Sequence, residues 1–251
     1  MGNNGGPVWQ LENQCALLRV GELTGQIELN QPAKGIANPS WQGEPIGAHC
    51  LGIVGDGQQD QPLGPVQDSF VRGSDLVVSY APTEQRPHAA QVYWRAVKAA
   101  AGGVLLDVIV FLQTDLLESY PQLATCSELR CDEVLVPTRG PADESLPIVE
   151  SDWQTIENET AKPGSGCVLF RHGRSSWSYA EMAHPQDSVQ WQLELTPPGR
   201  QIQWQFSGEF LEKGVIRCGR IRAALLPREA DLRLAANYWA EFAAQPPPLT
   251  V

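Results

Sequence analysis

Long apolar runs and an excess of basic residues are both missing from this chain. No apolar run approaches the roughly 20 residues that a membrane-spanning helix needs. The N-terminal stretch MGNNGGPVW has neither the basic nor the apolar region of a secretory signal. Lysine and arginine total 18 against 29 aspartates and glutamates, a net charge of −11. Because such a surface repels phosphate backbones and anionic lipids, we expect a protein that binds neither nucleic acid nor membranes. Its expected location, by default, is cytoplasmic.

The short motifs of several enzyme classes are also absent. No G-x-x-x-x-G-K-[ST], G-x-S-x-G or H-E-x-x-H occurs, so the sequence predicts no phosphate loop, nucleophile elbow or zincin helix. The pairs Cys126/Cys131 and Cys167/His172 are spaced too widely for a typical zinc hairpin, and in a strand they would point to opposite faces. We therefore expect no metal, no cofactor and six free thiols.

Short strand-like segments fill residues 8 to about 226. Apolar and glutamine residues alternate strictly over residues 201–206, which is typical of a sheet with one wet face. Residues 35–64 are rich in glycine and proline and predict a long loop with one strand inside it, whereas residues 128–136 predict a single strand. The composition favours one all-β domain over residues 8–251, preceded by a flexible tail over residues 1–7.

One stretch, residues 229–244, has the apolar stripe of an amphipathic helix. Acids near its start suit the helix dipole, and three consecutive prolines stop it. Trp239 and Phe242 share the stripe at i,i+3 spacing, so we expect them to anchor the helix against the sheets.

Two large rings and a carboxylate alternate in the stretch SSWSYAEMAHPQD, residues 175–187. In a strand, Trp177, Tyr179 and Glu181 share one face, and the small or flexible Ala180 and Met182 share the other. The second face suits close packing between sheets, and aromatic rings beside a carboxylate suit a sugar. We therefore expect the first face to form the wall of an open groove. The alternative is ordinary core, with Glu181 paired to Arg171 or Arg95.

Four histidines could each act as a general acid: His49, His88, His172 and His184. A single histidine near a strand end is more often structural than catalytic.

Three segments resemble the galactose mutarotase-like β-supersandwich, the fold of aldose epimerases and many carbohydrate-active enzymes. Residues 9–30 (WQLENQCALLRVGELTGQIELN) are similar to the opening strands of such domains. Residues 202–214 (IQWQFSGEFLEKG) resemble a late strand and turn, and residues 67–80 (QDSFVRGSDLVVSY) resemble the H-G-F-A-R segment. The resemblance implies a β-supersandwich and a carbohydrate ligand, and the apolar stripe over residues 229–244 adds one C-terminal helix to this fold.

The chain departs from the epimerase pattern at both catalytic positions. Asp68-Ser69 stands where the histidine of the H-G segment is expected, so only Phe70 and Arg72 match. The late strand, residues 220–226, carries no acid in place of the catalytic glutamate. Ring opening requires both a proton acceptor and a proton donor.

The sequence therefore favours a carbohydrate-binding protein of this fold. Its expected sugar contacts are Trp177, Tyr179, Arg72 and Arg95. An alternative is an epimerase-like isomerase, lyase or hydrolase. Its candidate acid and base residues are Glu181, Glu209, His184 and His88. A third alternative is a structural or interaction module whose groove is filled by its own side chains. The sugar and the oligomeric state are left open.

Overall fold

A computed structural model describes the placement of most of the chain. The described residues are 6–55, 63–100, 102–139, 148–156, 166–173, 175–187, 189–197, 199–206, 208, 210–246 and 248. Most of the expected N-terminal tail and the whole of Glu209 lie outside this part. The all-β prediction is confirmed, since strands dominate the described residues and one α-helix follows the last strand.

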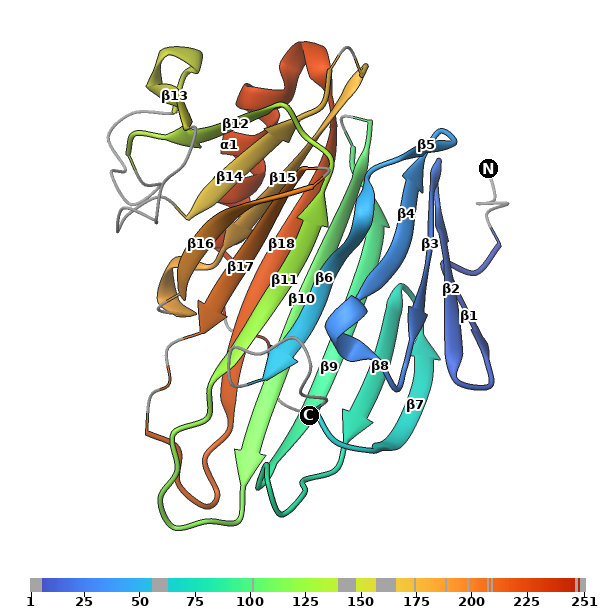
Figure 1. Ribbon diagram of the computed structural model, residues 1–251, viewed down its shortest axis with the longest axis vertical. Helices are drawn as coiled ribbons and strands as arrows, with labels where there is room; N and C mark the ends of the chain where they lie inside the picture. Colours follow the sequence, from blue (N-terminus) through green and yellow to red (C-terminus); the bar gives the residue numbers. More distant parts are fainter. Residues whose placement is uncertain are drawn as a thin grey trace.

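Two nine-stranded sheets lie face to face (Figure 1). Sheet A has the order β1-β2-β3-β4-β6-β11-β17-β16, with β5 paired to β4. Its strands are β1 (Trp9–Glu12), β2 (Cys15–Val20), β3 (Leu23–Glu28), β4 (Ile36–Trp41), β5 (Glu44–Pro45), β6 (Gly47–Gly55), β11 (Leu123–Leu129), β16 (Val189–Thr196) and β17 (Gly199–Phe206).

Sheet B has the order β13-β12-β14-β15-β18-β10-β9-β8-β7, and its described pairings are antiparallel. Its strands are β7 (Val66–Arg72), β8 (Asp75–Tyr80), β9 (His88–Lys98), β10 (Val104–Thr114), β12 (Glu133–Pro137), β13 (Trp153–Ile156), β14 (Cys167–Arg171), β15 (Trp177–Ala183) and β18 (Arg217–Pro227). The short 3-10 helices are η1 (Pro32–Lys34), η2 (Glu150–Asp152), η3 (Pro185–Asp187) and η4 (Arg228–Ala230).

Apolar side chains from the inner faces of both sheets form one core. Ile202 and Trp204 of β17 are fully buried there, while Gln205 on the opposite face is exposed, which confirms the predicted wet face of sheet A. Burial of such apolar surface is the main favourable contribution to folding.

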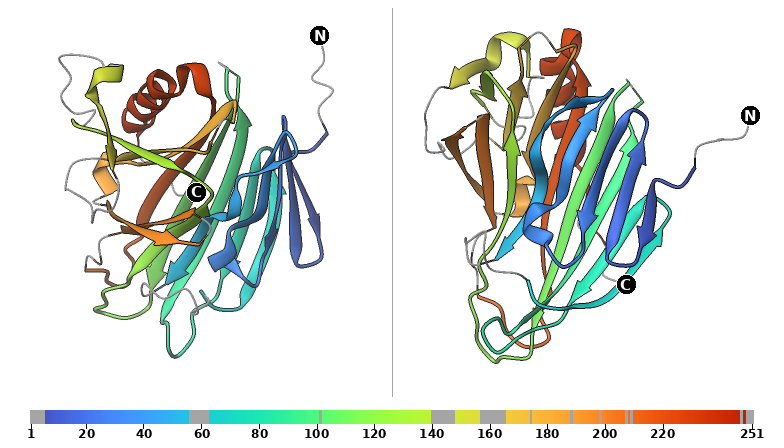
Figure 2. Two further views of the ribbon diagram at one scale, coloured as in Figure 1. Left: turned by 45° about the horizontal axis from the view of Figure 1, so that its top comes forward. Right: turned by 45° about the vertical axis from the view of Figure 1, so that its right-hand side comes forward.

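Helix α1 (Asp231–Ala243) lies on the outer face of sheet B, against β14, β15 and β18 (Figure 2). Trp239 and Phe242 are both buried in this contact, as predicted. The helix covers only one end of the sheet. The outer faces of β7, β8 and β9 carry no helix within the described part of the chain.

Two sequence predictions about strands were wrong. The expected loop over residues 35–64 contains β4, which was concealed by Pro39 and by Asn38, whose φ of 49° marks an irregularity in the strand. The expected strand over residues 128–136 is two strands, because the chain leaves sheet A after Leu129 and enters sheet B at Glu133. Alternation of side chains cannot show a change of sheet.

All six cysteines carry free thiols. No helix among the described residues is long and apolar enough to cross a membrane. Within the same residues, no group of three or more histidine, cysteine or acidic side chains is placed to hold a metal ion.

Candidate functional site

The predicted groove wall lies inside the sandwich. Trp177, Tyr179 and Glu181 point from β15 toward sheet A, and each is almost completely buried. The prediction that they form an open groove was therefore wrong. The opposite face, with Ala180 and Met182, packs beneath α1 rather than between the sheets.

Three neutral donors from both sheets satisfy the buried carboxylate of Glu181. Its Oε1 accepts bonds from the Ser127 hydroxyl (2.5 Å) and the Tyr179 hydroxyl (2.7 Å), and its Oε2 accepts one from the Trp204 indole (2.7 Å). Burial raises the pKa of Glu181, and these three bonds oppose the shift. The group therefore joins sheet B to sheet A without an arginine partner.

The two arginines proposed as partners of Glu181 are committed elsewhere. Arg171 forms a bidentate pair with Asp231 at the start of α1. Arg95 pairs with Asp75 on the outer face of sheet B. The Ser127 and Trp204 donors were missed because they come from strands of the other sheet, far from β15 in the sequence.

His184 is also unsuited to the predicted role of acid at a sugar site. It is buried at the end of β15, where its Nδ1 lies 2.8 Å from the Arg220 guanidinium and its Nε2 lies 3.1 Å from the Gln245 carbonyl oxygen. Arg220 also bonds to both carboxylate oxygens of Asp187 and to the carbonyl of Pro246. The cluster therefore fixes the chain segment that follows α1.

The remaining predicted residues divide into two groups. His88 begins β9 opposite Thr114 and is absent from the lining of the pocket described below, and Glu209 lies outside the described residues. Arg72 and Arg95 do line that pocket, on the outer face of sheet B.

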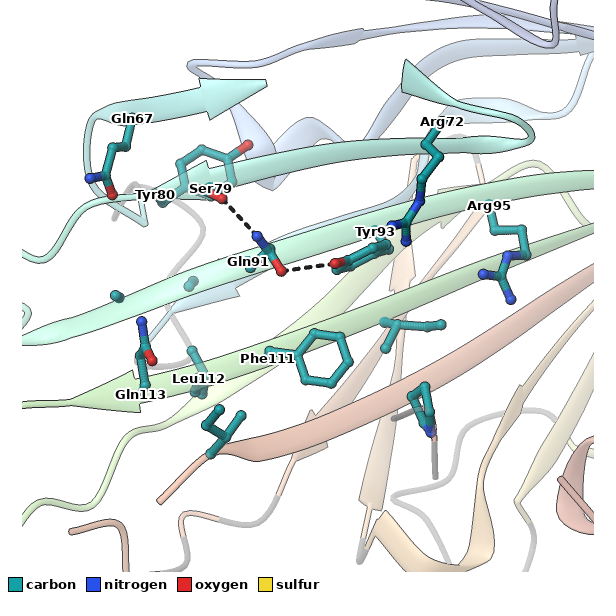
Figure 3. A pocket seen from close by; sticks show the side chains of 15 residues that line it. Gln67, Arg72, Ser79, Tyr80, Gln91, Tyr93, Arg95, Phe111, Leu112 and Gln113 are labelled. Carbon is teal, nitrogen blue, oxygen red and sulfur yellow. Dashed lines mark hydrogen bonds between the residues drawn. The ribbon is translucent and has the colours of Figure 1, made fainter. Parts of the chain in front are cut away.

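This outer-face pocket has a volume of about 350 Å³ and lies over β7 to β10, beyond the area that α1 covers (Figure 3). Tyr93 and Phe111 form its aromatic floor, with ring centroids 5.6 Å apart and planes at 79°. Ile216, before β18, and Pro248, after α1, complete one side. The alternating pattern of β9 explains the geometry, because Val92 and Trp94 point into the core while Gln91, Tyr93 and Arg95 point outward.

A chain of hydrogen bonds crosses the pocket beside the rings. The Tyr93 hydroxyl donates to Gln91 Oε1 (2.9 Å), and Gln91 Nε2 donates to the Ser79 hydroxyl (3.0 Å). Figure 3 shows these groups, from the neighbouring strands β8 and β9, in one row.

The described lining offers rings, amides, hydroxyls and two guanidinium groups, but no carboxylate or imidazole. This combination suits binding through stacking and hydrogen bonds. The sequence analysis missed Tyr93, Phe111 and Gln91. The signal for Gln91 and Tyr93 was the alternation of β9, where every second residue from 91 to 95 is polar or amphipathic, whereas Phe111 lies on the mostly apolar β10.

No protein-family model and no curated protein match the sequence, whereas solved structures match the fold. Heparan sulfate lyase from Pedobacter heparinus matches with a TM-score of 0.52 and 8% identity, over 90% of this chain and 37% of the lyase. The GalM/aldose epimerase homologue from C. elegans matches with a TM-score of 0.50 and 10% identity, over 84% of this chain and 98% of the homologue. A candidate aldose 1-epimerase from Klebsiella pneumoniae matches with a TM-score of 0.50 and 11% identity, over 92% of this chain and 84% of the other.

These matches confirm the fold class inferred from the sequence. The chain has the galactose mutarotase-like β-supersandwich fold, and it spans little more than a third of the lyase. Identities this low concern the fold alone.

Proposed function

We propose that the protein binds a saccharide in the outer-face pocket of sheet B. The observation that carries the proposal is the Tyr93–Phe111 floor beside the Gln91–Ser79 hydrogen bond. Sugar rings present apolar C–H faces that stack on aromatic rings, and their hydroxyls exchange hydrogen bonds with amides and hydroxyls. The volume of about 350 Å³ lies within the range of small-molecule sites.

The proposed sugar contacts differ from those first expected. Tyr93 and Phe111 replace the buried Trp177 and Tyr179 as the stacking rings, and Arg72 and Arg95 keep their proposed roles. The aldose epimerase homologue and the lyase with the same fold agree with a sugar-related role.

The test compares two aromatic pairs by isothermal titration against a panel of mono- and oligosaccharides. For any sugar of the panel that binds the wild-type protein, the double variant Tyr93→Ala/Phe111→Ala should raise the dissociation constant by at least about tenfold. The matched control is Tyr120→Ala/Phe210→Ala, because these rings also contact each other, at 5.8 Å, but Tyr120 is 59% exposed and neither ring lines the pocket. Equal losses in both variants, or no loss in the first, would contradict the proposal.

A further inference from the structure

Five charged residues of alternating sign form a row across the outer face of sheet B. Each is the direct cross-strand neighbour of the next, from β7 through β8, β9 and β10 to β18. In that order they are Arg72, Asp75, Arg95, Asp107 and Arg222. Because side chains of paired residues stand on the same face of a sheet, the row is continuous. It holds three cations and two anions.

Four members of the row pair off. Arg222 binds both oxygens of Asp107 at 2.6 and 2.9 Å, under the ring of Phe242. Arg95 binds both oxygens of Asp75 at 2.7 and 2.9 Å. Bidentate pairs of this kind use the full fork of the guanidinium group.

Arg72 is the cation left over. Asp75 lies opposite it, but both oxygens of Asp75 are engaged by Arg95. No other acid among the described residues pairs with Arg72. Asp68 stands on the same face of β7 but four residues away, about 13 Å along the strand, and its Oδ1 accepts a bond from its own neighbour.

The unpaired guanidinium belongs to the pocket. Arg72 lines it, and Figure 3 shows its side chain extending toward Tyr93. Arg95, whose side chain is 41% exposed, lies at the same end of the pocket. Asp75 neutralises one of the two guanidinium groups, so this end carries one net positive charge. Gln67, Gln113 and the Gln91–Ser79 pair make the other end neutral, so the charge of the pocket is asymmetric.

We propose that the pocket selects a saccharide bearing one anionic substituent, a carboxylate, sulfate or phosphate, which Arg72 binds while the sugar ring lies on Tyr93 and Phe111. The proposal rests on the saccharide site proposed above. The anion would complete the alternation of the row at its open end. The strongly acidic surface of the whole chain does not prevent this, since charges beyond about 8 Å are largely screened at physiological salt.

The experiment measures dissociation constants for glucose, glucuronate, glucose 6-sulfate and glucose 6-phosphate, which share one ring and differ in charge. At least one anionic probe should bind about three- to tenfold more tightly than glucose, and the preference should shrink at high salt. The comparison among the three anions identifies the substituent. Arg72→Gln should remove the preference, so that the variant binds the anionic probes no more tightly than it binds glucose, while Arg72→Lys should keep part of the preference because the charge remains but the fork is lost.

Arg19→Gln is the matched control, since it removes the same charge from an exposed strand position on the outer face of sheet A. It should leave the preference intact. If no anionic probe binds more tightly than glucose, or if Arg72→Gln weakens all four probes equally, the inference is wrong. A glucose affinity that still depends on Tyr93 would then leave the proposed saccharide site standing. Failure of all four probes to bind wild type would overturn both.

Discussion

Sheet B places aromatic rings beside polar groups on both of its faces, with opposite consequences. On the inner face, Trp177, Tyr179 and Glu181 are buried, and the carboxylate is fully occupied by donors within the protein. On the outer face, Tyr93 and Phe111 are partly exposed and border a pocket. The inner group stabilises the contact between the sheets, whereas the outer group is available to a ligand.

The difference arises from what covers each face. Sheet A supplies Ser127 and Trp204 to Glu181, so the inner polar group costs little to bury. Helix α1 covers the outer face over β14, β15 and β18 and ends before β9. Tyr93 on β9 and Phe111 on β10 consequently have no opposing layer within the part of the chain that the structure describes. A ring beside a polar group therefore indicates a ligand site only where no second layer covers it.

The largest expected difference between the faces is in stability. Trp177→Ala should lower the free energy of unfolding by about 3–5 kcal/mol, because a fully packed ring leaves a cavity in the core. Phe111→Ala should cost less than about 2 kcal/mol, since its ring is partly exposed. Urea denaturation of the two variants measures both values. Similar losses would mean that the outer ring is packed as tightly as the inner one.

A second comparison separates the charge of Glu181 from its role as acceptor. Glu181→Leu should destabilise the protein by about 2–4 kcal/mol, because it leaves the donors of Ser127, Tyr179 and Trp204 unpaired.

Glu181→Gln should cost only about 1 kcal/mol, as its oxygen can accept from the Trp204 indole while its amide donates to the two hydroxyls. Urea denaturation curves of Glu181→Leu and Glu181→Gln measure the two losses in the free energy of unfolding. Equal effects of Leu and Gln would show that the negative charge, not the hydrogen bonds, matters at this site.

Much of the fold could be predicted from the sequence, and the candidate site only in part. Periodicity identified most strands and the C-terminal helix, because alternation and the 3.6-residue stripe are local properties. Alternation also grouped Trp177 correctly with Glu181. It could not show that this face is the inner one, since that depends on Trp204 and Ser127, which belong to strands of the other sheet. The sequence analysis also singled out Arg72 and Arg95. It could not show that Asp75 pairs with Arg95 rather than with Arg72, because that depends on the order of β7, β8 and β9 in the sheet.

The smallest expected effect concerns the covered half of the outer face, where His184 lies beneath the end of α1. Burial, and then the nearby Arg220 guanidinium, lower the pKa of His184 below 6.5, against the opposing influence of Asp187 and of backbone carbonyls at and just after the end of the helix. Below pH 6.5 the unfolded chain takes up a proton at this residue before the native protein does. The contribution of neutral His184 to the free energy of unfolding is therefore fully present above pH 6.5 and decreases as the pH falls.

We expect a loss of stability as the pH falls below 6.5 that is absent from His184→Gln, whose neutral amide can still bond to Arg220 and to the Gln245 carbonyl. Unfolding curves measured in urea across this range give the difference between the two proteins. A wild type and His184→Gln that lose stability in parallel would show that the imidazole takes up its proton in the folded state as readily as in the unfolded one.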